Sequence, residues 1–157
     1  MIYDLIIVGG GMSGISVGHH FRDKNILILE KGSLLSGATG HNAGFVIFGF
    51  GEHYAKTVSR LGHNRAHEIQ NLHLKNHSMI QELARNFYRK VGSFTVSYYE
   101  TEFHNVKQSY ELLKSDGFHV DWIDSVDCGL KNPSAGILNH HDGVIDSAQF
   151  WNFLAAD

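Results

Sequence analysis

Cysteine, proline and excess positive charge are nearly absent from this sequence, which has one cysteine and one proline among 157 residues. The lone Cys128 cannot form an intrachain disulfide, which excludes a small secreted disulfide scaffold and a cysteine-rich zinc site. A reducing, cytoplasmic compartment is therefore expected. Thirteen Lys and Arg residues against sixteen Asp and Glu residues give a net charge of −3, so nucleic acid is not an expected partner.

Long hydrophobic runs are also missing. The first apolar run, residues 2–8, carries Asp4, lacks a basic leader and meets glycines long before the ~18 apolar residues that a membrane span needs. We expect neither a signal peptide nor a membrane span. Hydrophobic residues make up 43% and charged residues 18%, which is typical of a globular chain rather than a disordered one.

The first thirty residues carry the order strand, glycine turn, helix, strand. The apolar run at residues 2–8 is followed by three glycines and a helical pattern to about Phe21, and a second apolar run at residues 26–29 ends on Glu30. Because both runs are continuous rather than alternating, they are typical of a parallel sheet that is covered on both faces. The segment is predicted to be a βαβ unit.

The glycine turn matches the dinucleotide-binding fingerprint at Gly9, Gly11 and Gly14. In this fingerprint the first glycine makes a tight turn, the second lets the backbone approach a pyrophosphate, and the third packs the helix on the strand. Glu30 follows about 20 residues later, where a carboxylate accepts hydrogen bonds from a ribose. A glycine turn in another α/β protein is the alternative, and the fingerprint alone does not choose between nicotinamide and flavin dinucleotides.

Residues 31–51 form a long loop rich in glycine and small side chains, and loops of this length usually bind something. Further helices are predicted at residues 52–61, 64–90 and 102–115, strands at 94–99, 118–123 and 135–139, and a last helix capped by Asp146 or Ser147. In the long helix the apolar arc that includes Ile69, Leu72 and Met79 is predicted to face the core. Pro133 is predicted to lie in a turn.

Several of these runs resemble a known family. DLIIVGGGMSGISVG, LILEKG and SGATGHNAGF resemble the N-terminus of the D-amino-acid oxidase superfamily, the FAD-dependent amine and amino-acid oxidoreductases that include glycine oxidase and sarcosine oxidase. The likeness extends with lower specificity over GSFTVSYYE, ELLKSDGFHVDWID and GVIDSAQFWNFLA. It implies hydride transfer to flavin from the carbon next to the amine of a small-molecule amine or amino acid, which gives an imine that water hydrolyses.

The resemblance also implies which residues contact FAD. At the pyrophosphate it implies Gly9, Gly11, Met12, Ser13 and Gly14. At the adenosine ribose it implies Glu30, with Lys31 beside it. Near the pyrophosphate, ribityl chain and flavin ring it implies Ala38, Thr39, His41, Asn42, Ala43, Gly44 and Phe45. At His41 many relatives carry arginine, and some carry a histidine that holds the flavin covalently. We expect non-covalent FAD, with a covalent link at His41 as the alternative.

The implied fold class is α/β, with a Rossmann-like FAD-binding βαβ unit interleaved with the start of an α+β substrate domain. Residues 1–50 are expected in the FAD-binding domain, 51–92 in connecting helices, 93–142 in the substrate domain and 143–157 in a helix returning to the FAD-binding domain. In the family the remaining strands and flavin contacts come later in the chain. We therefore expect an incomplete fold, inactive alone, that a C-terminal portion would complete.

Two other functions remain open at this point. The chain could be a truncated, non-catalytic remnant that binds a dinucleotide or a partner, or part of a nicotinamide-dependent dehydrogenase. The sequence shows neither a nucleophile elbow nor a Ser-His-Asp arrangement, and no catalytic residue is assigned.

Twelve histidines raise the question of a metal site. His63 and His67, and again His73 and His77, stand four residues apart, as two ligands on one helix face would. They fall opposite the apolar arc of their helix, without an HExxH motif or partnering cysteines. A solvated helix face and no metal are therefore predicted for these residues, and His140 is given no role.

Overall fold

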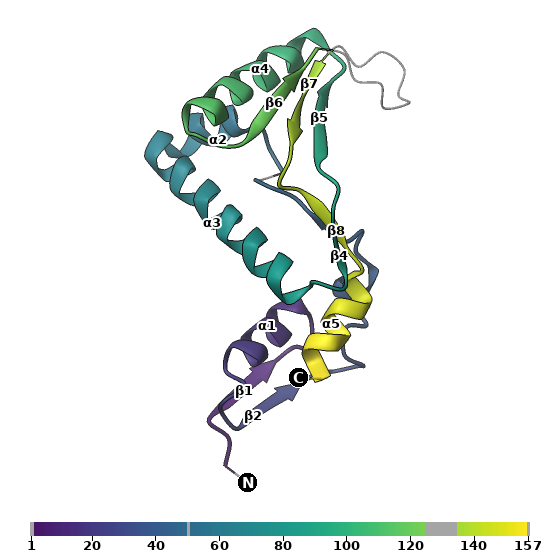
Figure 1. Ribbon diagram of the computed structural model, residues 1–157. Helices are drawn as coiled ribbons and strands as arrows, with labels where there is room; N and C mark the ends of the chain where they lie inside the picture. The colour runs from purple at the N-terminus through teal and green to yellow at the C-terminus, as the bar shows by residue number, and fades with distance from the viewer. Residues whose placement is uncertain (1, 50, 125–134, 157) are drawn as a thin grey trace. The chain divides into compact units, whose positions relative to one another are not determined.

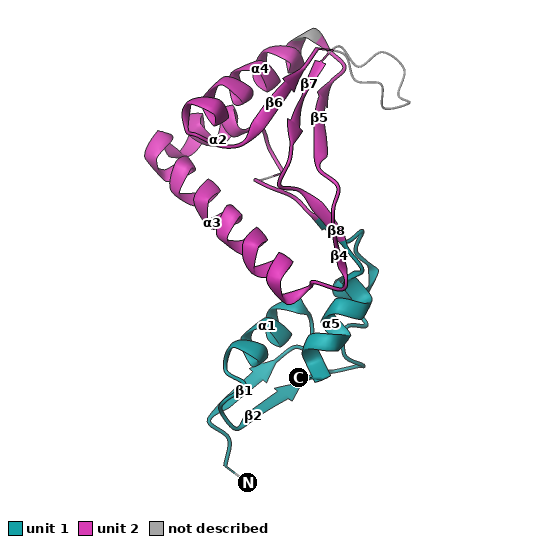
Figure 2. Cartoon of the chain, viewed as in Figure 1, with its two compact units in different colours: residues 1–45, 145–157 teal, residues 46–144 magenta. Residues whose placement is uncertain are grey.

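The computed structural model describes residues 2–49, 51–124 and 135–156, whose helices and strands are drawn in Figure 1. Cys128 and the turn predicted at Pro133 lie outside the described residues. The chain forms two compact units, one of residues 1–45 and 145–157 and the other of residues 46–144 (Figure 2). None of the described helices is long and apolar enough to cross a membrane.

The first unit contains the predicted βαβ pattern. Its elements are β1 (Leu5–Val8), α1 (Met12–His20), β2 (Ile26–Leu29), the 3₁₀ helix η1 (Ala38–His41) and α5 (Ser147–Ala156). Strands β1 and β2 pair in parallel, with Leu5 opposite Ile26, which confirms the predicted unit. Helix α5 contacts α1 and buries Phe150 and Leu154.

Asp146, one of the two N-cap residues predicted for the last helix, caps the N-terminus of α5. Asp146 Oδ1 accepts a hydrogen bond from the backbone N–H of Gln149 at 3.0 Å, so a carboxylate satisfies one of the donors that the first helical turn leaves without an intrahelical acceptor. The cap fixes where α5 starts and therefore where its buried side chains face.

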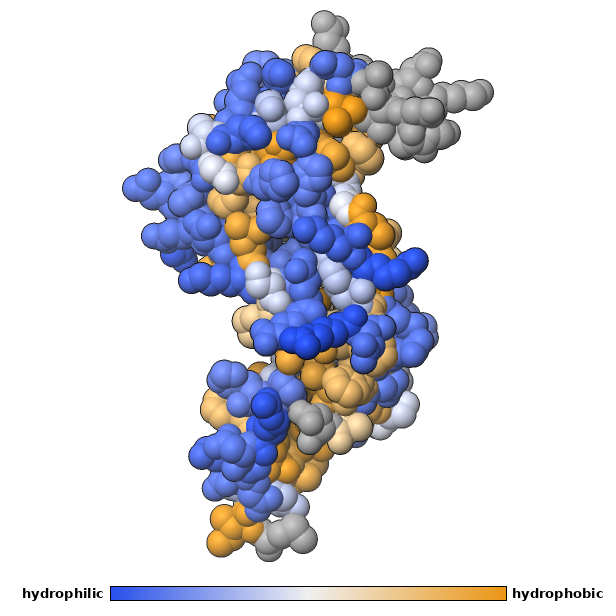
Figure 3. Space-filling view, viewed as in Figure 1, coloured by the Kyte–Doolittle hydropathy of each residue, from blue (hydrophilic) through white to orange (hydrophobic). Residues whose placement is uncertain are grey.

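One face of the two-stranded sheet stays uncovered among the described residues. Ile7 is buried, whereas Ile6 is 55% and Val8 85% exposed. Apolar surface of this kind is visible on the first unit in the space-filling view (Figure 3). The expectation that both faces are covered is therefore not met within the described chain, although the strands themselves are where the apolar runs placed them.

The second unit combines helices with a three-stranded antiparallel sheet. Its elements are α2 (Tyr54–Leu61), α3 (His63–Leu83), β4 (Tyr88–Lys90), β5 (Ser93–Ser97), α4 (Glu100–Ser115), β6 (Val120–Ile123) and β7 (Ala135–Asn139). The sheet has the order β5-β7-β6, and a second small sheet has the order β3 (Phe45–Val46), β8 (Gly143–Ile145), β4. Helix α4 contacts all three strands of the first sheet (Figure 1).

The core of the second unit is built from apolar side chains on both helices and strands. Its buried members are Phe48, Tyr54, Ala66, Val106, Leu113, Phe118, Val120 and Ile137. Strands β6 and β7 each contribute to this core from alternate positions, because successive side chains in a strand point to opposite faces.

Helix α3 departs from its prediction in both length and orientation. It ends at Leu83 rather than at residue 90, and β4 follows it. Its buried residues are Ala66, Gln70 and His77, whereas Leu72 is 59% and Met79 58% exposed, so the predicted core face was wrong. The small side chain of Ala66 suits a tightly packed helix contact, and His77 Nδ1 on this face lies 3.4 Å from the His141 carbonyl oxygen.

Asp142 is the centre of the polar interior of the second unit. The fully buried carboxylate accepts hydrogen bonds from Phe48 N–H at 2.6 Å and Ser93 Oγ–H at 2.5 Å. Its backbone carbonyl accepts two more, from the N–H groups of Val91 at 3.2 Å and Gly92 at 2.8 Å. Asp142 thus connects its own segment to two others that are distant in sequence, at Phe48 and at residues 91–93.

Replacing Asp142 with alanine is expected to destabilise the protein by about 3 kcal/mol, because two buried donors lose a charged acceptor. The measurement is the free energy of unfolding in urea. Asp142→Asn retains an acceptor oxygen and is expected to lose less. The exposed Asp23, which pairs with Lys24, serves as the control, and Asp23→Ala should leave stability unchanged. Equal stability of Asp142→Ala and Asp23→Ala would contradict the role of Asp142.

Candidate functional site

The turn between β1 and α1 can be made only with glycine at two positions. Gly9 has φ +108°, a conformation that side chains with a Cβ rarely adopt, and its N–H donates to the Leu29 carbonyl at 2.8 Å. A Cβ at Gly14 would overlap the carbonyl oxygen of Gly9. The first turn of α1 therefore lies directly against the end of β1.

The backbone N–H groups of the first turn of α1 lie at this turn. Its N-cap, Gly11, makes no side-chain capping bond, and the first turn contains no acidic residue. Met12 N–H donates to Thr39 Oγ1 at 3.0 Å, while the N–H groups of Ser13 and Gly14 belong to the same turn, where an α-helix supplies no acceptor. Free donors and the helix dipole together favour an anion here.

Glu30 stands at the end of β2 and is held by the backbone of the glycine turn. Its Oε2 accepts Gly10 N–H at 2.7 Å and its Oε1 accepts Gly32 N–H at 3.0 Å. The hydrogen bond from Gly10, followed by that from Gly32, lowers the pKa of the Glu30 carboxyl below its usual value. The group is an ionised acceptor fixed next to the turn, with the exposed Lys31 beside it.

Residues 38–45 cross the start of α1 and are tied to the start of α5. The Thr39 carbonyl accepts Asn42 Nδ2–H at 2.7 Å and Ser147 Oγ–H at 3.1 Å, and Asn42 also donates to Ser147 Oγ at 2.8 Å. Gly44 N–H donates to Asn42 Oδ1 at 2.7 Å. At Gly44, φ is +70° and a Cβ would overlap the Ile145 carbonyl, so this position also requires glycine.

His41 lies on the surface of this loop. Its Nδ1 donates to the Gly37 carbonyl at 3.0 Å, so Nε2 is the nitrogen left unprotonated in the neutral ring. The neighbouring Ala38, Ala43 and Phe45 are exposed too.

The structure brings most of the predicted residues together. The fingerprint glycines, Met12 and Ser13 line the start of α1, Glu30 is bonded to the turn, and Thr39, Asn42 and Gly44 belong to one hydrogen-bonded loop. Lys31, Ala38, His41, Ala43 and Phe45 sit beside them in sequence with exposed side chains. That these residues hold a cofactor stays a prediction.

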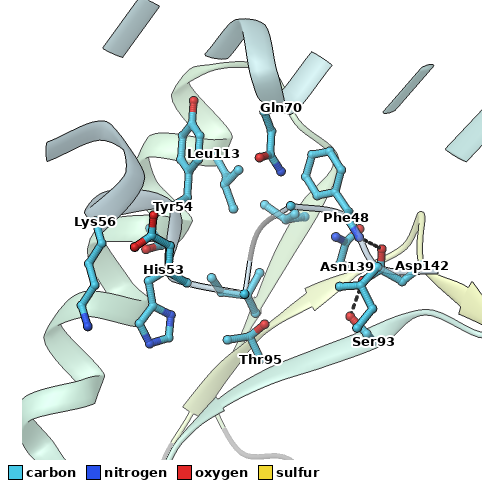
Figure 4. Close-up of a pocket in the computed structure, with 17 residues that line it drawn as sticks. Phe48, His53, Tyr54, Lys56, Gln70, Ser93, Thr95, Leu113, Asn139 and Asp142 are labelled. Carbon is cyan, nitrogen blue, oxygen red and sulfur yellow. Dashed lines mark hydrogen bonds between the residues drawn. The ribbon is translucent and has the colours of Figure 1, made fainter. Parts of the chain in front are cut away.

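A separate cavity of about 430 Å³ lies within the second unit (Figure 4). Gln70 lines it, and its buried Oε1 has no hydrogen-bond partner among the described residues. The two lining serines are already engaged, since Ser93 donates to Asp142 and Ser109 donates to the Asn105 carbonyl. The described lining thus offers space without an activated nucleophile.

The histidines of α3 do not form the solvated face that was predicted. His77 is 4% exposed, and His73 accepts a hydrogen bond from Gly49 N–H at 3.2 Å. Burial, followed by the charge of His77, lowers the pKa of His73. Among the described residues, the three potential metal ligands that cluster are His119, Asp121 and His140. Sequence spacing missed them because His119 and Asp121 lie at the start of β6, whereas His140 directly follows β7.

Comparison with known proteins gives one family match. A family model described as FAD dependent oxidoreductase matches residues 4–157. Among curated proteins, the probable oxidoreductase OrdL of Haemophilus influenzae is 28% identical over 81 residues, which are 50% of this chain and 19% of that protein.

Solved structures share the fold at low sequence identity. Glycine oxidase from Geobacillus kaustophilus superposes with a TM-score of 0.80 at 20% identity, over 98% of this chain and 43% of that one. L-alpha-glycerophosphate oxidase from Mycoplasma pneumoniae with FAD bound gives 0.72 at 18% identity, over 98% and 41%. L-proline dehydrogenase from P. horikoshii gives 0.69 at 19% identity, over 98% and 41%. The chain spans less than half the length of each.

Gly14→Ala is expected to destabilise the protein by about 2 kcal/mol, because the added methyl group must displace the Gly9 carbonyl. The measurement is the midpoint of thermal unfolding. Gly37→Ala is the matched control, since a Cβ there meets nothing within 4 Å and φ is −87°. If Gly14→Ala unfolded at the same temperature as Gly37→Ala, the close approach of α1 to β1 would be wrong.

Proposed function

The chain belongs to the FAD-dependent oxidoreductase family, and from that premise we propose that its first unit binds FAD non-covalently, as part of an enzyme that oxidises the C–N bond of an amine or amino acid. The mixed helix and sheet fold matches the N-terminal part of the glycine oxidase-like FAD fold. The observation that carries the proposal is the uncapped N-terminus of α1 behind the glycine turn, with ionised Glu30 at the end of β2.

The residues present fit the charge of a dinucleotide. A pyrophosphate is an anion, and the first turn of α1 offers backbone donors without a competing acidic side chain. A ribose presents hydroxyl donors, and Glu30 is an ionised acceptor. The absence of a side chain at Gly11, where a Cβ would stand 3.3 Å from Thr39 Oγ1, lets a ligand approach the backbone closely.

The residues of the proposed cofactor site are those that the family resemblance implies. Gly9, Gly11, Met12, Ser13 and Gly14 bind the pyrophosphate, Glu30 and Lys31 lie at the adenosine ribose, and Ala38, Thr39, His41, Asn42, Ala43, Gly44 and Phe45 line the path toward the flavin ring. In the proposed division, residues 1–50 and 143–157 serve the FAD-binding domain, 51–92 are connecting helices, and 93–142 belong to the substrate domain.

When bound, FAD supplies the capacity to accept a hydride. The contribution of this chain is to hold the two phosphates and the adenosine ribose, and to keep residues 38–45 in one conformation through the Thr39, Asn42 and Ser147 hydrogen bonds. An amine or amino acid is the proposed substrate class, supported by relatives named glycine oxidase and L-proline dehydrogenase. No residue of the chain is proposed as catalytic.

We also propose that these 157 residues do not turn over substrate by themselves, because the chain spans 43% of the glycine oxidase structure. A further C-terminal portion would then supply the remaining contacts. A cytoplasmic location, from the single cysteine, is part of the same proposal. The second candidate, a non-catalytic remnant that binds a dinucleotide, shares the α1 site and differs in having no activity to restore.

The test is a titration of the flavin-free chain with FAD, FMN and NAD⁺. FAD is expected to bind with higher affinity than either FMN or NAD⁺. FMN lacks the adenosine half of FAD, which Glu30 and α1 are proposed to hold. Glu30→Gln should weaken FAD binding about tenfold, because a charged acceptor becomes neutral. Asp23→Asn, a change of the same kind at an exposed site, should leave affinity unchanged. Quenching of flavin fluorescence measures the affinity for FAD and FMN, and competition with bound flavin measures the affinity for NAD⁺.

Two outcomes would overturn this proposal. Tight NAD⁺ binding with no FAD binding would favour a nicotinamide-dependent dehydrogenase. Oxidation of glycine or another amino acid by the FAD-loaded 157 residues would show that the chain is active alone and would also exclude the non-catalytic remnant.

Acid precipitation of the FAD-loaded protein tests the mode of attachment. All flavin is expected in the supernatant, in the wild-type chain and in His41→Gln alike, because a non-covalent cofactor is released when the fold is lost. Flavin absorbance in the redissolved pellet is the measurement. Flavin retained in the wild-type pellet but released by His41→Gln would establish a covalent link at His41 instead.

A further inference from the structure

Two histidines and an aspartate converge at one end of the β5-β7-β6 sheet. Val120 of β6 pairs with Asn139 of β7, and this is the last pair of the two strands. His119 directly precedes Val120, His140 directly follows Asn139, and Asp121 is the second residue of β6. One potential ligand atom from each residue lies within 4.8 Å of the other two.

We propose that His119, Asp121 and His140 form a surface site for a divalent transition-metal ion of the Zn²⁺ type. Two imidazole nitrogens and one carboxylate oxygen match the ligands that zinc, nickel and copper prefer, whereas magnesium and calcium prefer oxygen alone. The site belongs to the second unit, and its existence does not depend on the function proposed for the first.

The three side chains are already in contact with one another. His140 Nε2–H donates to Asp121 Oδ2 at 2.6 Å, and the imidazole rings of His119 and His140 stack with centroids 4.5 Å apart and planes 18° apart. A metal ion would bind Nε2 and Oδ2 in place of this hydrogen bond.

The geometry needs only small movements. Zinc binds imidazole nitrogen and carboxylate oxygen at ~2.0–2.1 Å, which puts tetrahedral ligand atoms ~3.4 Å apart. The distance between His140 Nε2 and Asp121 Oδ2 must increase slightly from 2.6 Å. The largest distance between two ligand atoms, which is at most 4.8 Å, must decrease. His119 is exposed and Asp121 and His140 are half-buried, so side-chain rotation can achieve both.

Three protein ligands on an accessible surface leave a coordination position for water, as in open zinc sites. Since the ligands lie at the adjoining ends of β6 and β7, the ion crosslinks these two ends. Binding to the folded chain alone stabilises it by mass action, in proportion to the logarithm of metal concentration over the dissociation constant. The expected result is a thermal unfolding midpoint that rises with Zn²⁺.

The experiment is isothermal titration of the metal-free 157-residue chain, without a histidine tag, with ZnCl₂. One Zn²⁺ per chain is expected at the highest-affinity site, and His119→Ala and His140→Ala should each weaken it at least tenfold. His104→Ala removes an exposed histidine from α4 of the same unit and should leave the affinity unchanged. Far-ultraviolet circular dichroism verifies that each variant is folded.

Co²⁺ provides a second readout, because its visible absorption reports coordination by protein nitrogen. The wild type and His104→Ala should develop the band, whereas Asp121→Ala should develop it only weakly. Mg²⁺ should neither bind nor displace Zn²⁺. Failure of the wild type to bind Zn²⁺ would overturn the site, and so would equal Zn²⁺ affinity in His104→Ala and in the His119 and His140 variants.

Discussion

Thr39 holds together three segments that lie far apart in the sequence. Its hydroxyl accepts the Met12 N–H at the start of α1, and its carbonyl accepts the Asn42 amide of its own loop and the Ser147 hydroxyl at the start of α5. Because Thr39 is only 6% exposed, these bonds compete little with water. The position of residues 38–45 over the positive end of α1 depends on them.

The two units organise opposite charges by different means. In the first, the backbone donors at the start of α1 favour an anion, and the nearby ionised carboxylate of Glu30 accepts hydrogen bonds from Gly10 and Gly32. In the second, the buried carboxylate of Asp142 serves the fold, whereas Asp121 lies at the surface with two imidazoles and suits a cation. The cofactor proposed for the first unit and the metal ion proposed for the second can therefore be tested separately.

Sequence patterns predicted local structure well where the residues that interact are close in sequence. The strands and helix of the βαβ unit and the cap at Asp146 follow from residues close in sequence, and the structure has them. The patterns were wrong for α3, because the side that a helix buries depends on what packs against it. His77 is buried beside Phe48, and Met79 is exposed.

The sequence alone determined that a glycine turn joins strand to helix. Only glycine tolerates the positive φ at Gly9 and the close contact of Gly14 with the carbonyl oxygen of Gly9. It could not place Thr39 against Met12, because nothing local relates residues 27 positions apart. Nor could it bring His140 to His119 and Asp121, since that depends on the register between β6 and β7. Long-range strand pairing and packing, which only the tertiary structure defines, decided both arrangements.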